Sequence, residues 1–224
     1  MQHYQAEGFV PAVDDRLDSG APYAAWGKRA FDIVLAIAIA PFVGLTVALL
    51  AAAVTLSDGG RPFFGHVRVG RDGRLFRCWK LRTMVPDAEA RLQDHLDSDP
   101  AAAAEWAVYR KLTDDPRITP LGEFLRRTSL DELPQLWNVL RGDMSFVGPR
   151  PVTPDELEMY GAARTAYWAV RPGITGLWQV SGRNEVTYDE RVRLDGAYLR
   201  RIGLVTDLAI MLRTALVIVR PTGR

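Results

Sequence analysis

The sequence predicts an α+β protein that is mostly helical, with a small β-hairpin, an N-terminal membrane helix kinked by a proline, and interfacial helices. Three observations carry this prediction. A run without charge extends from Ile33 to Ser57, residues 63–81 have the pattern of a hairpin, and the segments beyond carry helix caps and stops. The formal net charge is only +1, so no global signal indicates a polyanionic partner.

Residues 1–24 contain prolines, glycines and a loose cluster of acids, and this composition predicts a mobile tail. The membrane segment is expected at 25–58. As one straight helix, its uncharged run would reach roughly 37 Å, which is enough to cross a hydrocarbon core of about 30 Å. A signal peptide is not indicated, because the run starts too late and is too long.

Two features favour a re-entrant helix, which enters and leaves on the same side of the membrane. Pro41 removes a helical hydrogen bond and crowds the preceding turn, so the helix is expected to kink there. Basic residues flank both ends of the run, and the positive-inside tendency places both flanks in the cytoplasm. A single ordinary span stays open on these residues alone, since spanning helices tolerate proline. Asp32 is expected to pair with Lys28, four residues before it.

The stretch 59–201 reads as one compact, mostly helical domain. It begins with the predicted hairpin, whose turn holds Asp72 and Gly73. Thr119 precedes Pro120 as a capping residue, and Gly142 is a helix stop. Together with other prolines, these signals predict helices at 86–96, 100–112, 120–127 and 134–140.

The C-terminal segment 202–224 contains a last helical pattern. Asp207 and Arg213 interrupt its apolar run, which favours an interfacial helix over a membrane span. A helix packed in the core of the domain stays open as the alternative.

Cysteine and charge usage narrow the function classes. The single Cys78 excludes an internal disulfide and suits a reducing compartment, and the scattered histidines indicate no zinc site. Seven Lys and Arg stand between Arg61 and Arg82 against one acid, so either an anion binds there or the hairpin has a solvated basic face. A nucleic-acid binder is disfavoured by the near-zero net charge and by the lack of a nucleic-acid motif.

The stretch SLDELPQL at 129–136 places Asp131 and Glu132 side by side. Ser129 and Glu132 have the spacing of a capping box, which is a purely structural role. Pro134 favours the other interpretation, in which the helix begins near Leu133 or Pro134 and both acids precede it.

In that second interpretation the two acids would lie beside a helix start, where backbone N–H groups attract anions such as phosphate. Carboxylates and phosphates repel each other unless a cation intervenes. Mg²⁺ prefers one or two carboxylates together with phosphate oxygens, and arginine forks also match phosphate. The pattern therefore indicates metal-assisted phosphoryl chemistry, or direct attack of an aspartate on phosphorus.

Five stretches resemble the bacterial sugar transferases, the monotopic phosphoglycosyl transferase family. The resemblance covers roughly residues 26–220, with motifs in order along the chain. These are KRAFDI (28–33), KLRTM (80–84), DPRITPLGEFLRRTS (115–129), TSLDELPQLWNVLRGDMSFVGPRP (128–151) and RPGITGLWQVSGR (171–183).

This resemblance implies transfer of a sugar-1-phosphate from a UDP-sugar to polyprenol (undecaprenyl) phosphate, with release of UMP. Asp131 would be the nucleophile that forms a covalent phosphosugar intermediate. Glu132, with Asp131, would hold Mg²⁺ against the diphosphate. The protein would be monotopic in membrane lipid at the cytoplasmic face of the bacterial inner membrane, with its catalytic domain on that face and Pro41 at the kink.

The resemblance also bears on the biological context. The short tail resembles the compact form that starts exopolysaccharide repeat units, with galactose or glucose as the expected sugar. A homodimer is compatible with this form, and nucleic acid is not an expected partner. A non-catalytic membrane scaffold of a polysaccharide assembly complex is the rival, and the intact pair of Asp131 and Glu132 speaks against it.

Basic residues complete the predicted site. Arg126 and Arg150 are the first candidates for binding phosphates, and Lys80 and Arg82 come next. Arg183 is a candidate for nucleotide or sugar. For each of them a structural ion pair, for example with Asp143 or Glu123, is the alternative role.

Overall fold

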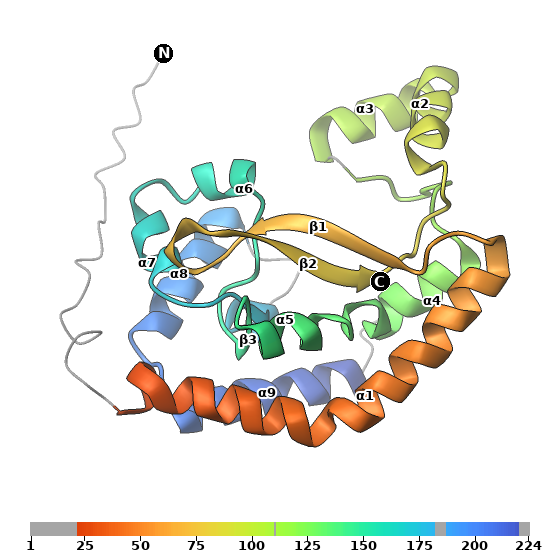
Figure 1. Ribbon diagram of the computed structural model, residues 1–224. Helices are drawn as coiled ribbons and strands as arrows, with labels where there is room; N and C mark the ends of the chain where they lie inside the picture. The colour runs from red at the N-terminus through yellow and green to blue at the C-terminus, as the bar shows by residue number, and fades with distance from the viewer. Residues whose placement is uncertain (1–21, 110, 182–186, 220–224) are drawn as a thin grey trace, which may run out of the picture. The chain divides into compact units, whose positions relative to one another are not determined.

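The computed structural model describes residues 22–109, 111–181 and 187–219. Within these ranges the chain is mostly helical, with two small two-stranded sheets and a long apolar helix near the N-terminus, α1 (Lys28–Asp58) (Figure 1). This confirms the mostly helical α+β class. The predicted tail lies almost entirely outside the described residues.

The elements after α1 include the predicted hairpin, the predicted helices between it and Gly142, and the last helix, together with elements that were not predicted. They are β1 Phe63–Val69, β2 Leu75–Leu81, α2 Ala88–Ser98, α3 Pro100–Tyr109, α4 Pro120–Thr128, α5 Gln135–Arg141, β3 Ser145–Val147, α6 Pro154–Glu158, α7 Arg164–Trp168, β4 Gly173–Thr175, α8 Tyr188–Leu199 and α9 Leu204–Val219.

Local chemistry explains why these elements begin and end where they do. Thr119 caps α4, because its hydroxyl accepts a hydrogen bond from the Gly122 N–H at 2.9 Å, with Pro120 at the first helical position. After α5, Gly142 has a φ of +91°, a conformation that glycine adopts without a Cβ penalty. Asp72 and Gly73 both have positive φ in the turn between β1 and β2, as the hairpin prediction requires.

The second sheet was not predicted. β3 and β4 pair in parallel, with Ser145 opposite Gly173 and Val147 opposite Thr175. Their connection contains α6 and α7, as a parallel pair needs a crossover. A Cβ at Gly173 would lie 2.1 Å from the backbone nitrogen of Gly148, so this close approach requires glycine.

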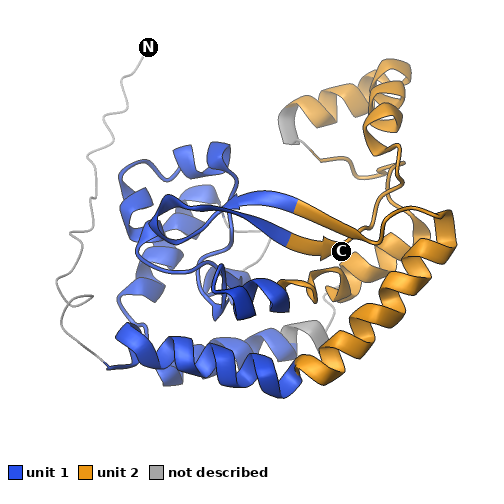
Figure 2. Ribbon diagram, in the orientation of Figure 1, with its two compact units in different colours: residues 1–39, 66–78, 136–224 blue, residues 40–65, 79–135 orange. Residues whose placement is uncertain are grey.

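The described chain forms two compact units (Figure 2). The first contains the described residues up to Ile39, the tip of the hairpin (His66–Cys78) and the described residues from Leu136 onward. The second contains Ala40–Gly65 and Trp79–Gln135. Both α1 and the hairpin therefore contribute to each unit.

In the first unit, α9 runs beside the beginning of α1 (Figure 1), and a buried carboxylate joins the two helices. Asp207 of α9 accepts hydrogen bonds from Lys28 at 2.6 Å, from the Tyr23 hydroxyl at 2.7 Å and from the Tyr198 hydroxyl at 2.8 Å. The predicted pairing of Lys28 with Asp32 is therefore wrong. Lys28 is committed to Asp207, and Asp32 accepts instead from the Ser145 hydroxyl and the Phe146 N–H.

In the second unit, the end of α1 packs on β2 and α4. Leu81 and Leu125 are buried against Ala51 and Val54 of α1. Burying each leucine contributes about 1.5–3 kcal/mol relative to leaving it in water. This cluster brings the end of β2 next to the turn that follows α4. The single cysteine, Cys78, lies in the other unit and is buried.

Among the described residues, one helix is long and apolar enough to cross a membrane, and it comprises α1 with the turn before it. Pro41 lies inside α1, which continues through it. Large apolar side chains are exposed along α1, including Val34, Ile37, Phe42, Leu45, Leu49 and Leu56. The re-entrant path stays a prediction.

Candidate active site

The two adjacent carboxylates lie in a single 3₁₀ turn, Leu130–Glu132, which follows α4 in the second unit. Ser129 precedes this turn in the left-handed conformation, with a φ of +57°, and its hydroxyl caps no N–H group among the described residues. The capping-box interpretation is therefore wrong. The helix begins at Gln135, close to the predicted start, because Pro134 suits a position just before the helical ladder.

Asp131 is the buried member of the pair, with 10% of its side chain exposed. Burial raises the pKa of its carboxyl above the ordinary aspartate value, and the negative charge of Glu132 adds to this. Lys80 and Arg126 act in the opposite direction and lower the pKa, because their positive charges favour the carboxylate. The site thus holds a poorly solvated carboxylate between two cations.

Lys80 is the cation nearest to both acids. It projects from the end of β2, and its Nζ lies 2.6 Å from Oε1 of Glu132 and 3.8 Å from Oδ2 of Asp131. Lys80 therefore forms a close ion pair with Glu132 and a longer contact with Asp131. The structure brings these three predicted site residues together.

Arg126 comes from the last turn of α4. Its Nε donates to the Thr83 hydroxyl at 2.8 Å, while its terminal nitrogens have no hydrogen-bond partner among the described residues. A guanidinium held at one edge with its fork open can bind a phosphate. The prediction that Arg126 binds phosphate is compatible with this geometry and stays a prediction.

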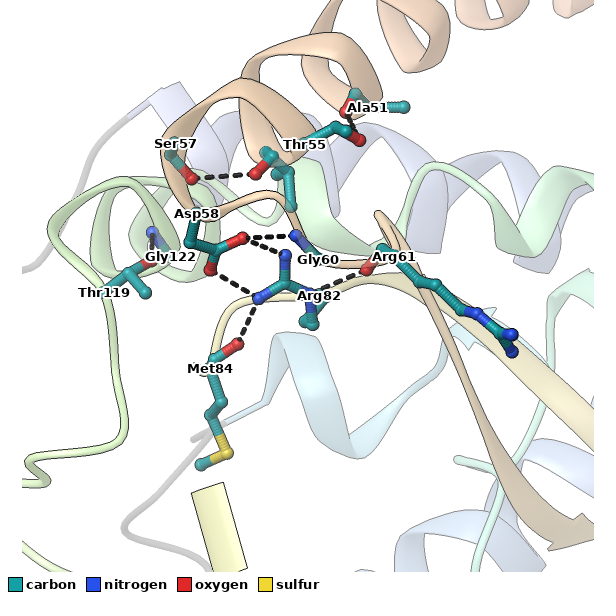
Figure 3. Close-up of polar contacts among 11 residues, drawn as sticks. Ala51, Thr55, Ser57, Asp58, Gly60, Arg61, Arg82, Met84, Thr119 and Gly122 are labelled. Carbon is teal, nitrogen blue, oxygen red and sulfur yellow. Dashed lines mark hydrogen bonds and ion pairs between the residues drawn. The ribbon is translucent and has the colours of Figure 1, made fainter. Parts of the chain in front are cut away.

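Arg82 makes different contacts from its neighbour Lys80. Figure 3 shows its guanidinium beside the carboxylate of Asp58, with which it forms a two-point ion pair. It also donates to the carbonyls of Arg61 and Met84. These contacts favour the alternative role, a structural ion pair, and its predicted phosphate binding stays a prediction.

The structure does not bring the remaining two basic candidates, Arg150 and Arg183, to the two acids. Arg150 follows β3 and is exposed, and it belongs to the first unit, whereas the acids belong to the second. Arg183 lies outside the described residues.

Sequence reasoning missed Thr83 and Gly122, which place Arg126. A Cβ on Gly122 would lie 2.0 Å from the Thr83 carbonyl oxygen, so only glycine lets the start of α4 approach this segment. The Thr83 carbonyl also accepts from the Thr119 N–H at 3.1 Å. The KLRTM stretch contains Thr83, but nothing in its spacing indicated this contact.

Known proteins share the region of the chain that contains the candidate site. The family model described as "Bacterial sugar transferase" matches residues 23–221. The chain belongs to the bacterial sugar transferase family. Residues of α1, both acids and all the described basic candidates lie inside the matched region.

Relatives of this bacterial sugar transferase differ in length. The undecaprenyl-phosphate galactose phosphotransferase of Salmonella typhimurium is 52% identical over 88% of this chain, and the UDP-galactose-lipid carrier transferase of Erwinia amylovora is 50% identical over 88%. In both, the match spans only 41% of the relative. The exopolysaccharide production protein ExoY of Sinorhizobium fredii is 48% identical over 86% of this chain and 85% of its own length.

Asp131 and Glu132 are the oxygen ligands that this sugar transferase could offer to Mg²⁺. No group of three or more His, Cys, Asp or Glu side chains gathers as a metal site in the part of the chain that the structure describes. Two adjacent carboxylates are nevertheless sufficient, because Mg²⁺ commonly takes one or two carboxylates and completes its shell with water and phosphate oxygens. Asp131 and Glu132 thus fit Mg²⁺ in donor type.

Proposed function

We propose that this chain transfers a sugar-1-phosphate from a UDP-sugar to polyprenol (undecaprenyl) phosphate and releases UMP. Galactose or glucose is the proposed sugar, and the step would start the assembly of an exopolysaccharide repeat unit. The observation that carries the proposal is the buried carboxylate of Asp131, next to Glu132 and Lys80. Membership of the sugar transferase family and the printed names of the relatives support it.

In the proposed first step, a carboxylate oxygen of Asp131 attacks the phosphorus that carries the sugar. The bond from that phosphorus to the bridging oxygen breaks, and UMP leaves with the electron pair. Burial supports this role, because a poorly solvated carboxylate loses less hydration when it attacks. Lys80 can offset the negative charge that gathers at the phosphoryl group, since its Nζ already lies near both acids.

In the second step, an oxygen of polyprenol phosphate attacks the same phosphorus. The bond to Asp131 breaks and its carboxylate is restored. Each step replaces one acyl or phosphoryl anhydride with another, so the whole reaction should be reversible.

Asp131 and Glu132 would hold Mg²⁺, which supplies positive charge against the diphosphate of the donor. Glu132 contacts Lys80 at 2.6 Å, so the ammonium and the metal would compete for the same carboxylate. Arg126, with its open fork, is the proposed second phosphate contact.

We place the protein at the cytoplasmic face of the bacterial inner membrane, with α1 as a re-entrant helix. The exposed apolar side chains of α1 support a membrane location. In α9, Leu204, Leu208, Leu212 and Leu216 recur every four residues and are all exposed, which supports an interfacial position for this helix.

Release of nucleoside monophosphate from a panel of UDP-sugars tests the proposal, in the presence of Mg²⁺ and polyprenol phosphate. Asp131→Asn removes the nucleophilic oxygen at nearly constant shape, so we expect release to fall by at least about a thousandfold while membrane association and fold are kept. Intact-mass analysis should detect a phosphosugar adduct on the wild type and none on Asp131→Asn. Activity of Asp131→Asn within about threefold of the wild type would exclude Asp131 as the nucleophile.

The non-catalytic scaffold is the second candidate, and the same assay separates it. A scaffold would release no nucleotide and form no adduct with any donor. The intact pair of carboxylates with its lysine favours the enzyme.

A further inference from the structure

Arg82 and Asp58 form a closed contact between the end of α1 and the end of β2. Both carboxylate oxygens of Asp58 accept from the terminal nitrogens of Arg82. Oδ1 of Asp58 also accepts from the Gly60 N–H at 3.0 Å. Figure 3 shows the guanidinium enclosed by these groups, whereas the Arg61 side chain points away from them.

The contact is well packed for a pair near the surface. Only 12% of the Arg82 side chain and 22% of the Asp58 side chain are exposed. Gly60 lies so close that a Cβ there would be 2.7 Å from Nη2 of Arg82. The Nε of Arg82 donates to the Arg61 carbonyl at 2.7 Å, and Nη1 donates to Met84 O at 2.9 Å. Four hydrogen bonds thus fix the orientation of this guanidinium.

Residues close to Arg82 in the chain, on both sides of it, contact residues of the candidate site. Two residues earlier, Lys80 binds Glu132 at 2.6 Å and approaches Asp131. One residue later, Thr83 accepts from Nε of Arg126. Arg82 therefore lies between the two backbone positions from which Lys80 and Thr83 reach the site.

We propose that Asp58 is a positioning residue of the active site, acting through Arg82. The ion pair fixes the backbone at the end of β2, and this sets where the Lys80 ammonium and the Thr83 hydroxyl lie. A displacement of about 1 Å in such groups can cost about a hundredfold in rate. The inference deepens the proposed function, on which its kinetic consequences rest.

The same contact links the site to the apolar helix. Asp58 is the last residue of α1, and Gly59, with a φ of +71°, ends the helix directly after it. If α1 lies in the membrane as proposed, the ion pair connects the membrane anchor with the residues that would meet a phosphate substrate.

The competing role for Arg82 is direct phosphate binding, and kinetics separate the two. If Arg82 positions the site, Asp58→Asn and Arg82→Ala should each lower kcat by about tenfold, with the KM for the UDP-sugar within about twofold of the wild type. The double variant should lose no more than either single one, because both remove the same contact. A raised KM in Arg82→Ala with an unchanged Asp58→Asn would overturn the proposal, as would losses that multiply.

A second measurement does not depend on turnover. The chain has three lysines, Lys28, Lys80 and Lys111. Amine labelling followed by mass spectrometry, without divalent cations, reports how firmly Lys80 is held by Glu132. We expect Asp58→Asn to raise the labelling rate of Lys80 by about fivefold relative to Lys111, because a loosened strand end frees the ammonium.

Arg68→Ala is the matched control. Arg68 is similarly buried, with 16% of its side chain exposed, and pairs at 2.8 Å with Glu156, which like Arg68 belongs to the first unit. This variant should leave both kcat and Lys80 labelling unchanged. If the wild type releases no nucleotide but Asp58→Asn still exposes Lys80, the proposed function fails and the positioning role stands. Unchanged Lys80 labelling in a folded Asp58→Asn protein would overturn the positioning role.

Discussion

Lys80 is shared unequally between two neighbouring carboxylates, and this inequality supports the different roles proposed for them. Glu132 holds the ammonium closely, whereas Asp131 is more deeply buried and only approached by it. Asp131 is therefore less tightly engaged by Lys80 than Glu132 is, which suits its proposed role as the nucleophile. Glu132 would gain most from a metal ion that replaced Lys80.

Lys80→Met tests this arrangement through pH dependence. The carboxylate of Asp131 is lost as pH falls through its pKa, and burial raises that pKa, so activity should already decline at a pH above the ordinary aspartate range. Removing Lys80 removes a charge that lowers the pKa, so the acid limb of kcat/KM should move to still higher pH. The measurement is kcat/KM across pH for both proteins. A limb that stays in place, or moves to lower pH, would show that Lys80 does not act on the nucleophile.

At the residue scale, the sequence predicted two acids just ahead of a helix with basic residues nearby, and the structure brings Lys80 to both acids. The sequence could not assign Lys80 to Glu132 or Arg82 to Asp58. Those pairings depend on how the end of β2 packs against α1 and α4, which local spacing does not encode. Asp58 was missed because its partner, Arg82, is 24 residues away in the chain and no local spacing relates the two.

Asp207 is a second residue whose partners could not be read from local spacing, and its role is structural. Three donors converge on this buried carboxylate, so Asp207→Ala leaves the Lys28 ammonium without its anion and should destabilise the protein by about 3–5 kcal/mol. Thermal unfolding in detergent measures this loss. Glu190→Gln, which breaks an exposed pair with Arg193 on α8, should leave the melting temperature nearly unchanged and serves as the control.

At the scale of elements, the prediction to test is the re-entrant path of α1, which we attribute to Pro41. Replacing Pro41 with leucine restores a helical hydrogen bond and removes the steric conflict, so a re-entrant segment should straighten toward a crossing. Accessibility labelling at both ends of α1 in sealed vesicles is the measurement. We expect same-side labelling in the wild type and opposite sides in the variant. Same-side labelling in both proteins would mean that the path does not depend on the proline.

The elements that the sequence predicted well are those with strong local signals. Thr119 and Pro120 marked the start of α4, and Asp72 with Gly73 marked the hairpin turn. The parallel pair of β3 and β4 was missed because each strand has only three residues. A segment that short shows no alternation, and its partner lies beyond two intervening helices.

At the scale of the whole molecule, exposed large apolar side chains are most numerous on two helices, α1 and α9. One face of α9 packs inward through Asp207 and Ile210, as the packing interpretation requires, and the interfacial position of its outer face stays a prediction. The exposed leucines leave a face that water would solvate poorly.

Spin labels on α9 test whether this outer face meets lipid. A label in place of Leu212 should be more accessible to oxygen than to a water-soluble nickel chelate when the protein is in a bilayer. A label in place of Arg201, which precedes the helix and is exposed, should show the reverse order and is the control. Equal chelate access at both positions would place the outer face of α9 in water.

The burial of Cys78 has a practical consequence. The sequence contains one cysteine, and this residue is 2% exposed. A polar maleimide added to the native protein should therefore meet almost no reactive sulfur. Any single cysteine introduced on the surface would become the dominant target, so the path of the chain through the bilayer can be mapped residue by residue without first rebuilding the interior.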